Sequence, residues 1–282
     1  MSGIPHPLKN RIALVTGASR GIGKGIALEL GAAGATVYVT GRSQQPGKLP
    51  GTVRDTAAQI DELGGTGIPV VCDHGDDDAT AALFEQIGNE QGHLDVLVNN
   101  VYNSPAAARW LGRKFWDVPP KAWDETFQIG VRSHYVASVY AAPLLLKNGG
   151  LIVNVSSPGA QRQMHNAVYG VGKAALDRMT ADLAHDLTDT DVTAVSIWPG
   201  LVATELLQLI PADDQGKRVV TLPGEGSFDL DEAETPRFAG RAVVALAADP
   251  DRKKRAGKSW KVADLAEDYG FTDIDGRVPR HD

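Results

Sequence analysis

The chain has 282 residues, of which 43% are hydrophobic and 22% charged, proportions that are ordinary for a globular protein. Its formal net charge of −7 argues against a general attraction to nucleic acid, and the basic run at residues 251–255 is interpreted as a solvated turn. The single cysteine, Cys72, excludes an internal disulfide and is predicted to lie in the core. The chain shows neither a signal-peptide pattern nor an apolar stretch long enough to span a bilayer, so we expect a cytoplasmic protein.

The first half of the chain alternates short Val/Ile-rich runs with longer segments of helical spacing. These predict strands at 11–16, 35–40, 68–72 and 94–98, and helices at 22–33, 52–63 and 79–91. The strand runs are nearly all apolar rather than alternating, as in parallel strands that are covered on both faces. The pattern predicts an α/β protein with a doubly wound parallel sheet between two helix layers, a Rossmann fold.

The second half continues this alternation. It predicts helices at 123–147, 169–187 and 238–248, and strands at 151–155, 193–198 and 259–262. Residues 203–237 break the pattern with weak periodicity and many acidic, Pro and Gly residues, over a length too great for a plain connection. The segment is either a disordered insertion or a mobile cover over a substrate, and we favour the cover. Since no linker-like break occurs, residues 1–282 are predicted to form one domain.

A glycine-rich turn follows the first strand, in Thr16-Gly17-Ala18-Ser19-Arg20-Gly21-Ile22-Gly23. Glycine lets the backbone turn tightly and approach a phosphate, and the helix N-terminus behind it offers free N–H groups and a positive dipole end. A glycine triplet alone is also compatible with an ordinary strand–helix turn. The order of strand, glycines and helix favours a dinucleotide site.

The end of the second strand bears on the choice of dinucleotide. NAD sites usually place an acid there for the ribose hydroxyls, whereas this chain has Gly41-Arg42-Ser43. Arg42, together with Arg20 in the glycine turn, is predicted to hold a 2′-phosphate through charge-assisted hydrogen bonds. The alternative is that both are solvated surface arginines. We expect NADP(H) to be preferred over NAD(H).

Tyr169 and Lys173 lie one turn apart on the same face of a predicted helix. A nearby cation favours phenolate and brings the tyrosine pKa toward the range useful for acid–base catalysis. The pair alone is also compatible with a surface contact, but the strand at 151–155 ends in Ser156-Ser157, where ligands of open α/β sheets bind. A hydroxyl there is expected to hold a carbonyl oxygen while Tyr169 supplies the proton.

Further motifs make the pattern specific: Asp73 follows the third strand, Asn99-Asn100 the fourth, and Pro199-Gly200…Thr204 the sixth. With these motifs the chain resembles the short-chain dehydrogenase/reductases over nearly its whole length. The resemblance implies a catalytic set of Ser157, Tyr169 and Lys173 and no metal. It also implies cofactor contacts through Gly17, Ser19, Arg20, Gly21, Ile22, Gly23, Arg42, Asp73, Asn99, Tyr169, Lys173, Pro199, Gly200, Val202 and Thr204.

The chain departs from the family pattern in three places. Where the family usually has Asn-Asn-Ala-Gly, this chain has Asn99-Asn100-Val101-Tyr102. The family's catalytic asparagine, which helps to carry a water-linked proton relay, falls at Gly130. The spacing from serine to tyrosine is one residue short, so Ser156 is an alternative to Ser157. Three segments among others are Val37-Tyr38-Val39-Thr40-Gly41-Arg42, Ser156-Ser157-Pro158-Gly159 and Ser196-Ile197-Trp198-Pro199-Gly200. With them the chain resembles the branch called dehydrogenase/reductase family member one, which shares the glycine and is associated with NADPH-linked carbonyl reduction.

These observations predict an NADP(H)-dependent oxidoreductase that transfers hydride between nicotinamide and a carbonyl or secondary alcohol. A non-catalytic NADP(H)-binding protein on the same fold is the alternative. The expected partner is a small carbonyl or alcohol substrate and a further copy of the chain in a dimer or tetramer, with no nucleic acid and no membrane. A bulky hydrophobic substrate is consistent with Trp110, Phe115, Trp116, Trp123 and Trp198, although these side chains are equally compatible with core and subunit contacts.

Overall fold

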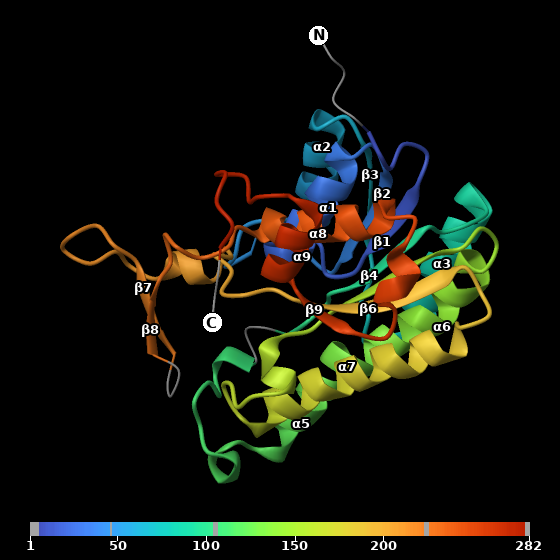
Figure 1. Ribbon diagram of the computed structural model, residues 1–282. Helices are drawn as coiled ribbons and strands as arrows, with labels where there is room; N and C mark the ends of the chain where they lie inside the picture. Colours follow the sequence, from blue (N-terminus) through green and yellow to red (C-terminus); the bar gives the residue numbers. More distant parts are fainter. Residues whose placement is uncertain (1–5, 46, 104–106, 223–225, 280–282) are drawn as a thin grey trace.

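The centre of the molecule is a seven-stranded parallel sheet (Figure 1), seen in a computed structural model that describes residues 6–45, 47–103, 107–222 and 226–279. The strand order is β3-β2-β1-β4-β5-β6-β9. The strands are β1 Ile12–Val15, β2 Thr36–Gly41, β3 Thr66–Val71, β4 Val96–Asn99, β5 Gly150–Val155, β6 Val192–Trp198 and β9 Ser259–Lys261. The order reverses between β1 and β4, so the crevice beyond their carboxyl ends is where such a fold binds ligands.

Helices cover both faces of the sheet, which confirms the predicted three-layer fold (Figure 1). One face packs against α1 Gly21–Ala32, α2 Val53–Glu62, α8 Pro236–Ala248 and α9 Val262–Tyr269. The other packs against α3 Asp77–Gln91, α6 Ser133–Leu145 and α7 Ala167–Asp186. Side chains of β1 alternate between the two cores, Ala13 and Val15 on one side and Ile12 and Leu14 on the other. The continuous apolar runs of the strands follow from this burial on both faces.

Local signals set the helix starts. Thr52 caps α2 in a reciprocal capping box with Asp55, and the Asp76 carboxylate accepts from the first amides of α3. Asn166 caps α7 by accepting from the Tyr169 amide. The cap at Asn166 therefore fixes where Tyr169 emerges from the helix. Cys72 is buried, as predicted.

The predicted helix at 123–147 is not continuous. Helix α5 begins earlier and spans Pro120–Phe127, a π-helical turn occupies Gln128–Arg132, and α6 follows. Gly130 lies in the π turn and is buried. Such turns are rare and frequently occur at functional sites, because they re-aim the residues on either side.

The segment 203–237 has structure of its own. It contains a 3₁₀ turn at Leu207–Leu209 and an antiparallel hairpin of β7 Val219–Leu222 and β8 Gly226–Asp229. Its buried side chains Val220, Leu230 and Ala233 form a small apolar cluster separate from the main cores. The hairpin projects from the side of the molecule (Figure 1). The weak periodicity of this segment thus reflects short elements rather than an irregular chain.

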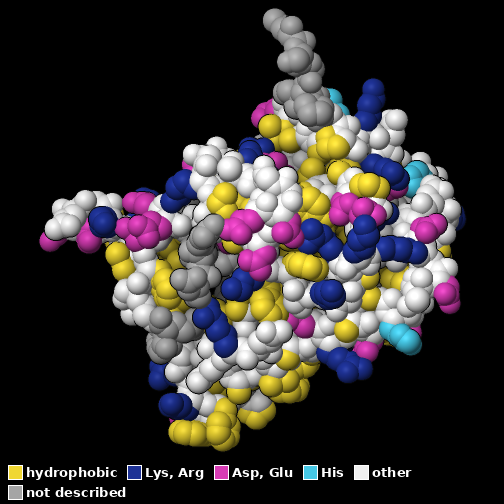
Figure 2. Space-filling model, viewed as in Figure 1, with side chains coloured by type: hydrophobic (Ala, Val, Ile, Leu, Met, Phe, Trp, Pro, Cys, Tyr) yellow, Lys and Arg dark blue, Asp and Glu magenta, His cyan; other side chains and the backbone are white. Residues whose placement is uncertain are grey.

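Two further features concern the surface. Lys/Arg and Asp/Glu side chains are interspersed on the face shown in Figure 2, which agrees with the mixed charge of the sequence. Among the described residues, no helix combines the length and the apolar character that crossing a bilayer requires.

Candidate active site

Ser157 and Tyr169 meet at the carboxyl end of β5. The Tyr169 hydroxyl donates to Ser157 Oγ over 2.8 Å, and Ser157 Oγ also accepts from the Gly159 amide at 3.1 Å. Ser156 faces the other way, since its hydroxyl donates to the Lys173 carbonyl at 3.2 Å. The structure thus brings Ser157, rather than Ser156, together with Tyr169.

Lys173 lies under this pair and is almost fully buried. Its Nζ donates to the Val155 carbonyl at 3.0 Å and stands 5.9 Å from the centroid of the Tyr169 ring. Burial lowers the pKa of Lys173 to about 8, and the charge of Asp177 opposes this shift. The ammonium is therefore held close to the phenol in a site that solvent hardly reaches.

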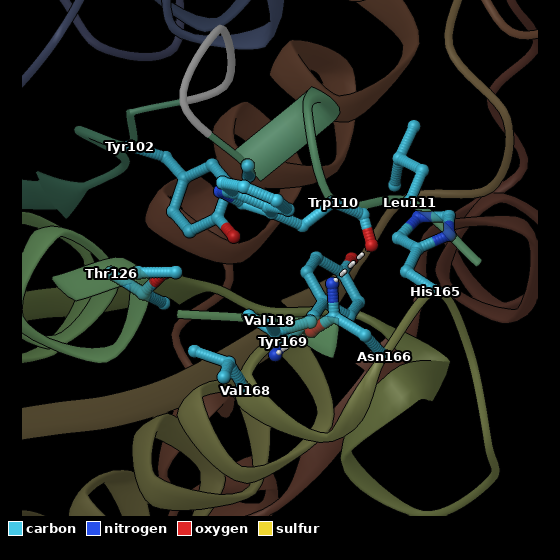
Figure 3. Close-up of a pocket in the computed structure, with 11 residues that line it drawn as sticks. Tyr102, Trp110, Leu111, Val118, Thr126, His165, Asn166, Val168 and Tyr169 are labelled. Atoms are coloured by element: carbon cyan, nitrogen blue, oxygen red, sulfur yellow. Dashed lines mark hydrogen bonds between the residues drawn. The ribbon is translucent and has the colours of Figure 1, made fainter. Parts of the chain in front are cut away.

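A small hollow, open to solvent, lies beside Tyr169 (Figure 3). The Trp110 carbonyl at its rim accepts from the Asn166 side chain at 2.9 Å. His165 has a φ of +58°, uncommon for a residue other than glycine, and its ring lies 4.6 Å from that of Tyr169. The hollow is lined by Tyr102, Ala107, Trp110, Leu111, Val118, Ala122, Thr126, His165, Asn166, Val168 and Tyr169.

The five aromatic residues that were expected to offer apolar surface to a substrate lie in different environments in the structure. Trp110 lines the hollow. Trp198 is buried and its indole N–H donates to Asp177, whereas Trp123 stacks on Phe127. Phe115 and Trp116 are exposed and pack edge to face against each other. Of these five, Trp110 is the one that the structure places where a substrate would contact Tyr169.

The glycine turn has the geometry of a phosphate cradle. Gly17 and Gly21 adopt positive φ values of +67° and +58°, which favour glycine. A Cβ on Gly23 would stand 2.3 Å from the side-chain nitrogen of Asn100. That nitrogen donates to the Thr16 and Gly17 carbonyls at 2.8 and 3.2 Å, so Asn100 braces the turn. Its bracing role depends on a contact between distant strand ends, which sequence spacing does not reveal.

An anionic side chain occupies the start of α1. The Gly21 amide donates to the Glu205 carboxylate at 2.8 Å, and Thr204 packs close to the same glycine. Free amides at a helix N-terminus bind anions, and here a carboxylate takes the place expected for a cofactor phosphate. The donor set therefore suits a dinucleotide pyrophosphate. The other predicted members of this turn lie close by, with Ser19 buried and Ile22 packed on the core.

Arg42 and Arg20 flank the carboxyl end of β2. Arg42 is largely exposed, and its guanidinium lies 3.7 Å from the Asp73 carboxylate. The Arg20 guanidinium donates to Ser43 Oγ at 2.9 Å and to the carbonyls of Pro50 and Gly51. Two guanidinium groups therefore stand at the edge where the adenosine end of a dinucleotide is expected.

Asn99 does not present its side chain at this edge. It is fully buried, and its amide nitrogen donates to Ser138 Oγ at 3.0 Å and to Asn154 Oδ1 at 2.9 Å. These bonds join β4 to β5 and α6 through the core. Any contact of Asn99 with a cofactor is left to its backbone.

Glu234 holds the turn after β6. Its carboxylate accepts from the Gly200 amide at 2.9 Å, and its backbone bridges to Val202, so it fixes the turn that begins at Pro199. Burial raises the pKa of Glu234 to about 8, with a further rise from Asp273 and an opposing effect of the Gly200 bond. Glu234 lies in the segment of weak periodicity, where no sequence signal marks it.

Comparisons with known proteins agree with this geometry. The family described as short chain dehydrogenase matches residues 11–215. Dehydrogenase/reductase SDR family member 1 of Mus musculus is 47% identical over 279 residues, which cover 96% of this chain and 85% of the relative.

Two solved structures have the same fold. A metagenomic short-chain oxidoreductase in complex with NADP is 27% identical, with a TM-score of 0.68 and 87% and 94% of the two chains covered. A 7 alpha-hydroxysteroid dehydrogenase complexed with NADH and 7-oxo glycochenodeoxycholic acid is 25% identical, with a TM-score of 0.72 and coverage of 90% and 93%. With an intact glycine cradle, a Ser157–Tyr169 pair and a family match over most of its length, the chain belongs to the short-chain dehydrogenases, oxidoreductases that act on CH–OH and C=O groups.

Proposed function

We propose that this oxidoreductase uses NADP(H) to interconvert a carbonyl and a secondary alcohol, with Tyr169 as the general acid and base. The observation that carries the proposal is the 2.8 Å hydrogen bond between the Tyr169 hydroxyl and Ser157 Oγ, next to the buried Lys173. A substrate oxygen within reach of both hydroxyls would accept two hydrogen bonds at the carboxyl end of the sheet.

The residues of the chain divide the work as follows. Bound nicotinamide supplies or accepts the hydride. Ser157 holds the substrate oxygen, and Tyr169 donates a proton to it in reduction or takes one in oxidation. The Lys173 ammonium favours the phenolate form of Tyr169 through its charge. The glycine cradle at Gly17 and Gly21 would hold the pyrophosphate, and Gly200 and Thr204 lie where the nicotinamide end is expected.

The preference for NADP(H) rests on charge. Arg42 and Arg20 stand at the end of β2, and neither Gly41 nor Ser43 beside them is acidic. Guanidinium groups bind phosphate by charge-assisted hydrogen bonds, and the NAD-type carboxylate is missing from this turn. The structural neighbours include one complex with NADP and one with NADH, so the arginines are what supports the choice.

The apolar lining of the hollow beside Tyr169, rather than its size, supports a hydrophobic carbonyl compound as substrate. The lining is mainly apolar and aromatic, with the Trp110 indole and the Tyr102 ring on one side (Figure 3). Apolar walls with a few convergent polar groups are typical of small-molecule sites. One structural neighbour holds a bile-acid derivative, a ligand of this kind.

Two further expectations belong to this proposal. Exposed Tyr135 and Val139 lie one turn apart on α6, an apolar stripe that suits contact with a second copy in a dimer or tetramer. The buried free thiol of Cys72 suits the reducing cytoplasm.

The experiment is NADPH oxidation measured against a panel of hydrophobic ketones and aldehydes, with NADH in parallel. We expect turnover with bulky ketones and a higher kcat/KM for NADPH. Tyr169→Phe should bind NADPH normally but lose turnover. A Tyr169→Phe variant as active as the native protein would overturn the mechanism. Equal kcat/KM for the two cofactors would overturn the NADP(H) preference.

A further inference from the structure

Gly130 and Tyr102, two departures from the family pattern, are in contact. A Cβ built on Gly130 would stand 2.9 Å from Cδ2 and 3.0 Å from Cε2 of the Tyr102 ring. Gly130 has no positive φ, so its backbone does not itself require glycine. The Tyr102 ring therefore limits the size of the side chain at position 130. The Cβ of an asparagine there would collide with the same two ring carbons. A small residue at 130 and an aromatic residue at 102 form a complementary pair.

The Tyr102 ring also faces the catalytic lysine. Lys173 Nζ lies 4.9 Å from the ring centroid, closer than the 5.9 Å that separates it from the Tyr169 ring. The Tyr102 and Tyr169 rings meet edge to face, with centroids 6.3 Å apart and an interplanar angle of 84°. Tyr102 therefore touches Gly130, Lys173 and Tyr169 at once.

The surroundings of Lys173 leave the ammonium few partners. Of the described residues, the Val155 carbonyl accepts its one hydrogen bond. The charged and titratable groups that face it are Asp177 on the same helix, His134 on α6, and the two tyrosines. Burial lowers the pKa of His134 to about 3, so that side chain is neutral. An aromatic face within about 6 Å attracts a desolvated cation through its quadrupole.

The two tyrosines around Lys173 are not equivalent. Burial, followed by the charge of Tyr169, raises the pKa of Tyr102, although Thr126 opposes the shift. Tyr102 therefore stays a neutral phenol throughout the working range. Its contribution is the ring face rather than a proton.

We propose that Tyr102 is a positioning residue, whose ring holds the Lys173 ammonium charged beside Tyr169, and that Gly130 is the small residue that admits the ring. The inference deepens the proposed function, because Lys173 acts on Tyr169 there. It also explains why this chain departs from the family at both positions together.

The direct test reads the Lys173 pKa and needs no turnover. Protein labelled with ¹³C at the lysine ε-carbon is titrated by NMR, and Lys173→Met assigns the signal. We expect Tyr102→Phe, which keeps the ring, to leave the Lys173 midpoint in place. Tyr102→Leu, which keeps an apolar filling without the ring face, should lower the midpoint by about one pH unit. An unchanged or higher midpoint in Tyr102→Leu would contradict the proposal.

The first part of a second test leaves Tyr102 intact and so stands even if Tyr102→Leu does not fold. Gly130→Ala adds one methyl group against the ring and should lower kcat about tenfold, with NADPH affinity within about twofold. Gly88→Ala in α3 is the matched control, since its Cβ would meet Leu144 at an ordinary 3.5 Å. Tyr102→Leu in the Gly130→Ala background should cause less additional loss than in the native protein. Native kcat in Gly130→Ala would overturn the pairing.

Absence of turnover in the native protein would defeat the proposed function alone. The NMR titration would still decide the role of Tyr102, because it measures the lysine and not the reaction.

Discussion

The carboxyl end of β5 and the segment 203–237 both contribute residues to the proposed active site but are built differently. At β5 the side chains proposed to react are fixed by hydrogen bonds: Lys173 donates to the Val155 carbonyl, and Tyr169 donates to Ser157. The segment has only a small apolar cluster of its own and reaches the cofactor edge through Glu205. Under the proposed function, the acid–base pair is therefore assembled before the cofactor binds, whereas a pyrophosphate at the Gly21 amide would displace the Glu205 carboxylate.

Ser157→Ala tests the preassembled region and should have the largest effect. Loss of a hydroxyl that holds the substrate oxygen should lower kcat about a hundredfold or more, because such bonds strengthen in the transition state. The control is Ser156→Ala, because the native Ser156 hydroxyl donates to a backbone carbonyl instead. This variant should lower kcat less than about threefold. Steady-state kinetics with one ketone and NADPH measures both. A greater loss in Ser156→Ala would reverse the assignment.

Lys173→Met measures how much the buried Lys173 charge lowers the free energy of unfolding. Because the folded pKa of Lys173 is lowered to about 8, the unfolded chain binds more protons between that pH and about 10.5. Native stability should therefore rise with pH across this window. Lys173→Met should raise the free energy of unfolding at pH 7 by about 1–2 kcal/mol, while abolishing turnover, and the gain should shrink toward pH 10.5. Urea titrations at both pH values check this, and a gain that grows with pH would contradict it.

Arg42→Ala tests whether the guanidinium at the carboxyl end of β2 binds the 2′-phosphate of NADPH. Removal of a guanidinium that binds a 2′-phosphate should weaken NADPH binding about tenfold and leave NADH binding within about twofold. Arg54→Ala, in the neighbouring α2, is a control for loss of a surface charge. Fluorescence titration with the two cofactors gives both affinities. Equal weakening for NADPH and NADH would place Arg42 away from the phosphate.

Glu205→Gln should have the smallest effect and the opposite sign. The carboxylate accepts from the Gly21 amide, where the pyrophosphate is expected, so the two anions compete. Removal of its charge should tighten NADPH binding about threefold and speed its association. Glu232→Gln, an exposed acid in the same segment, controls for net charge. Weaker NADPH binding in Glu205→Gln would show that the contact is compatible with the bound cofactor.

The sheet was predictable because its cause is local. Short, mostly apolar runs such as 151–155, each followed by a segment of helical spacing, favour parallel strands covered on both faces, and the glycine turn and the Tyr169–Lys173 spacing follow from short-range geometry. The strand-end position of Ser156-Ser157 predicted a hydroxyl near Tyr169, but Ser156 and Ser157 both remained candidates until the structure placed the Ser157 hydroxyl against Tyr169.

The remaining features depend on contacts between distant residues. The π turn at 128–132 interrupts a pattern that looks helical throughout, and α9 begins where the last strand was predicted to end. Asn100, Glu205 and Glu234 act through partners that lie far away in the chain. Periodicity carries no information about such pairs, so the contacts of these three residues with the turns proposed to bind the cofactor could be identified only from the structure.

Hydride transfer from nicotinamide to a carbonyl carbon, coupled to proton donation by Tyr169, is tested most directly by deuterium transfer from NADPH labelled at C4 of the nicotinamide. With a bulky ketone, the native protein should give an alcohol that carries deuterium at the former carbonyl carbon, from one of the two C4 epimers. Tyr169→Phe should bind the labelled NADPH and give almost none of this product. Deuterated alcohol formed by Tyr169→Phe at the native rate, or none formed by the native protein with any ketone tested, would contradict the account.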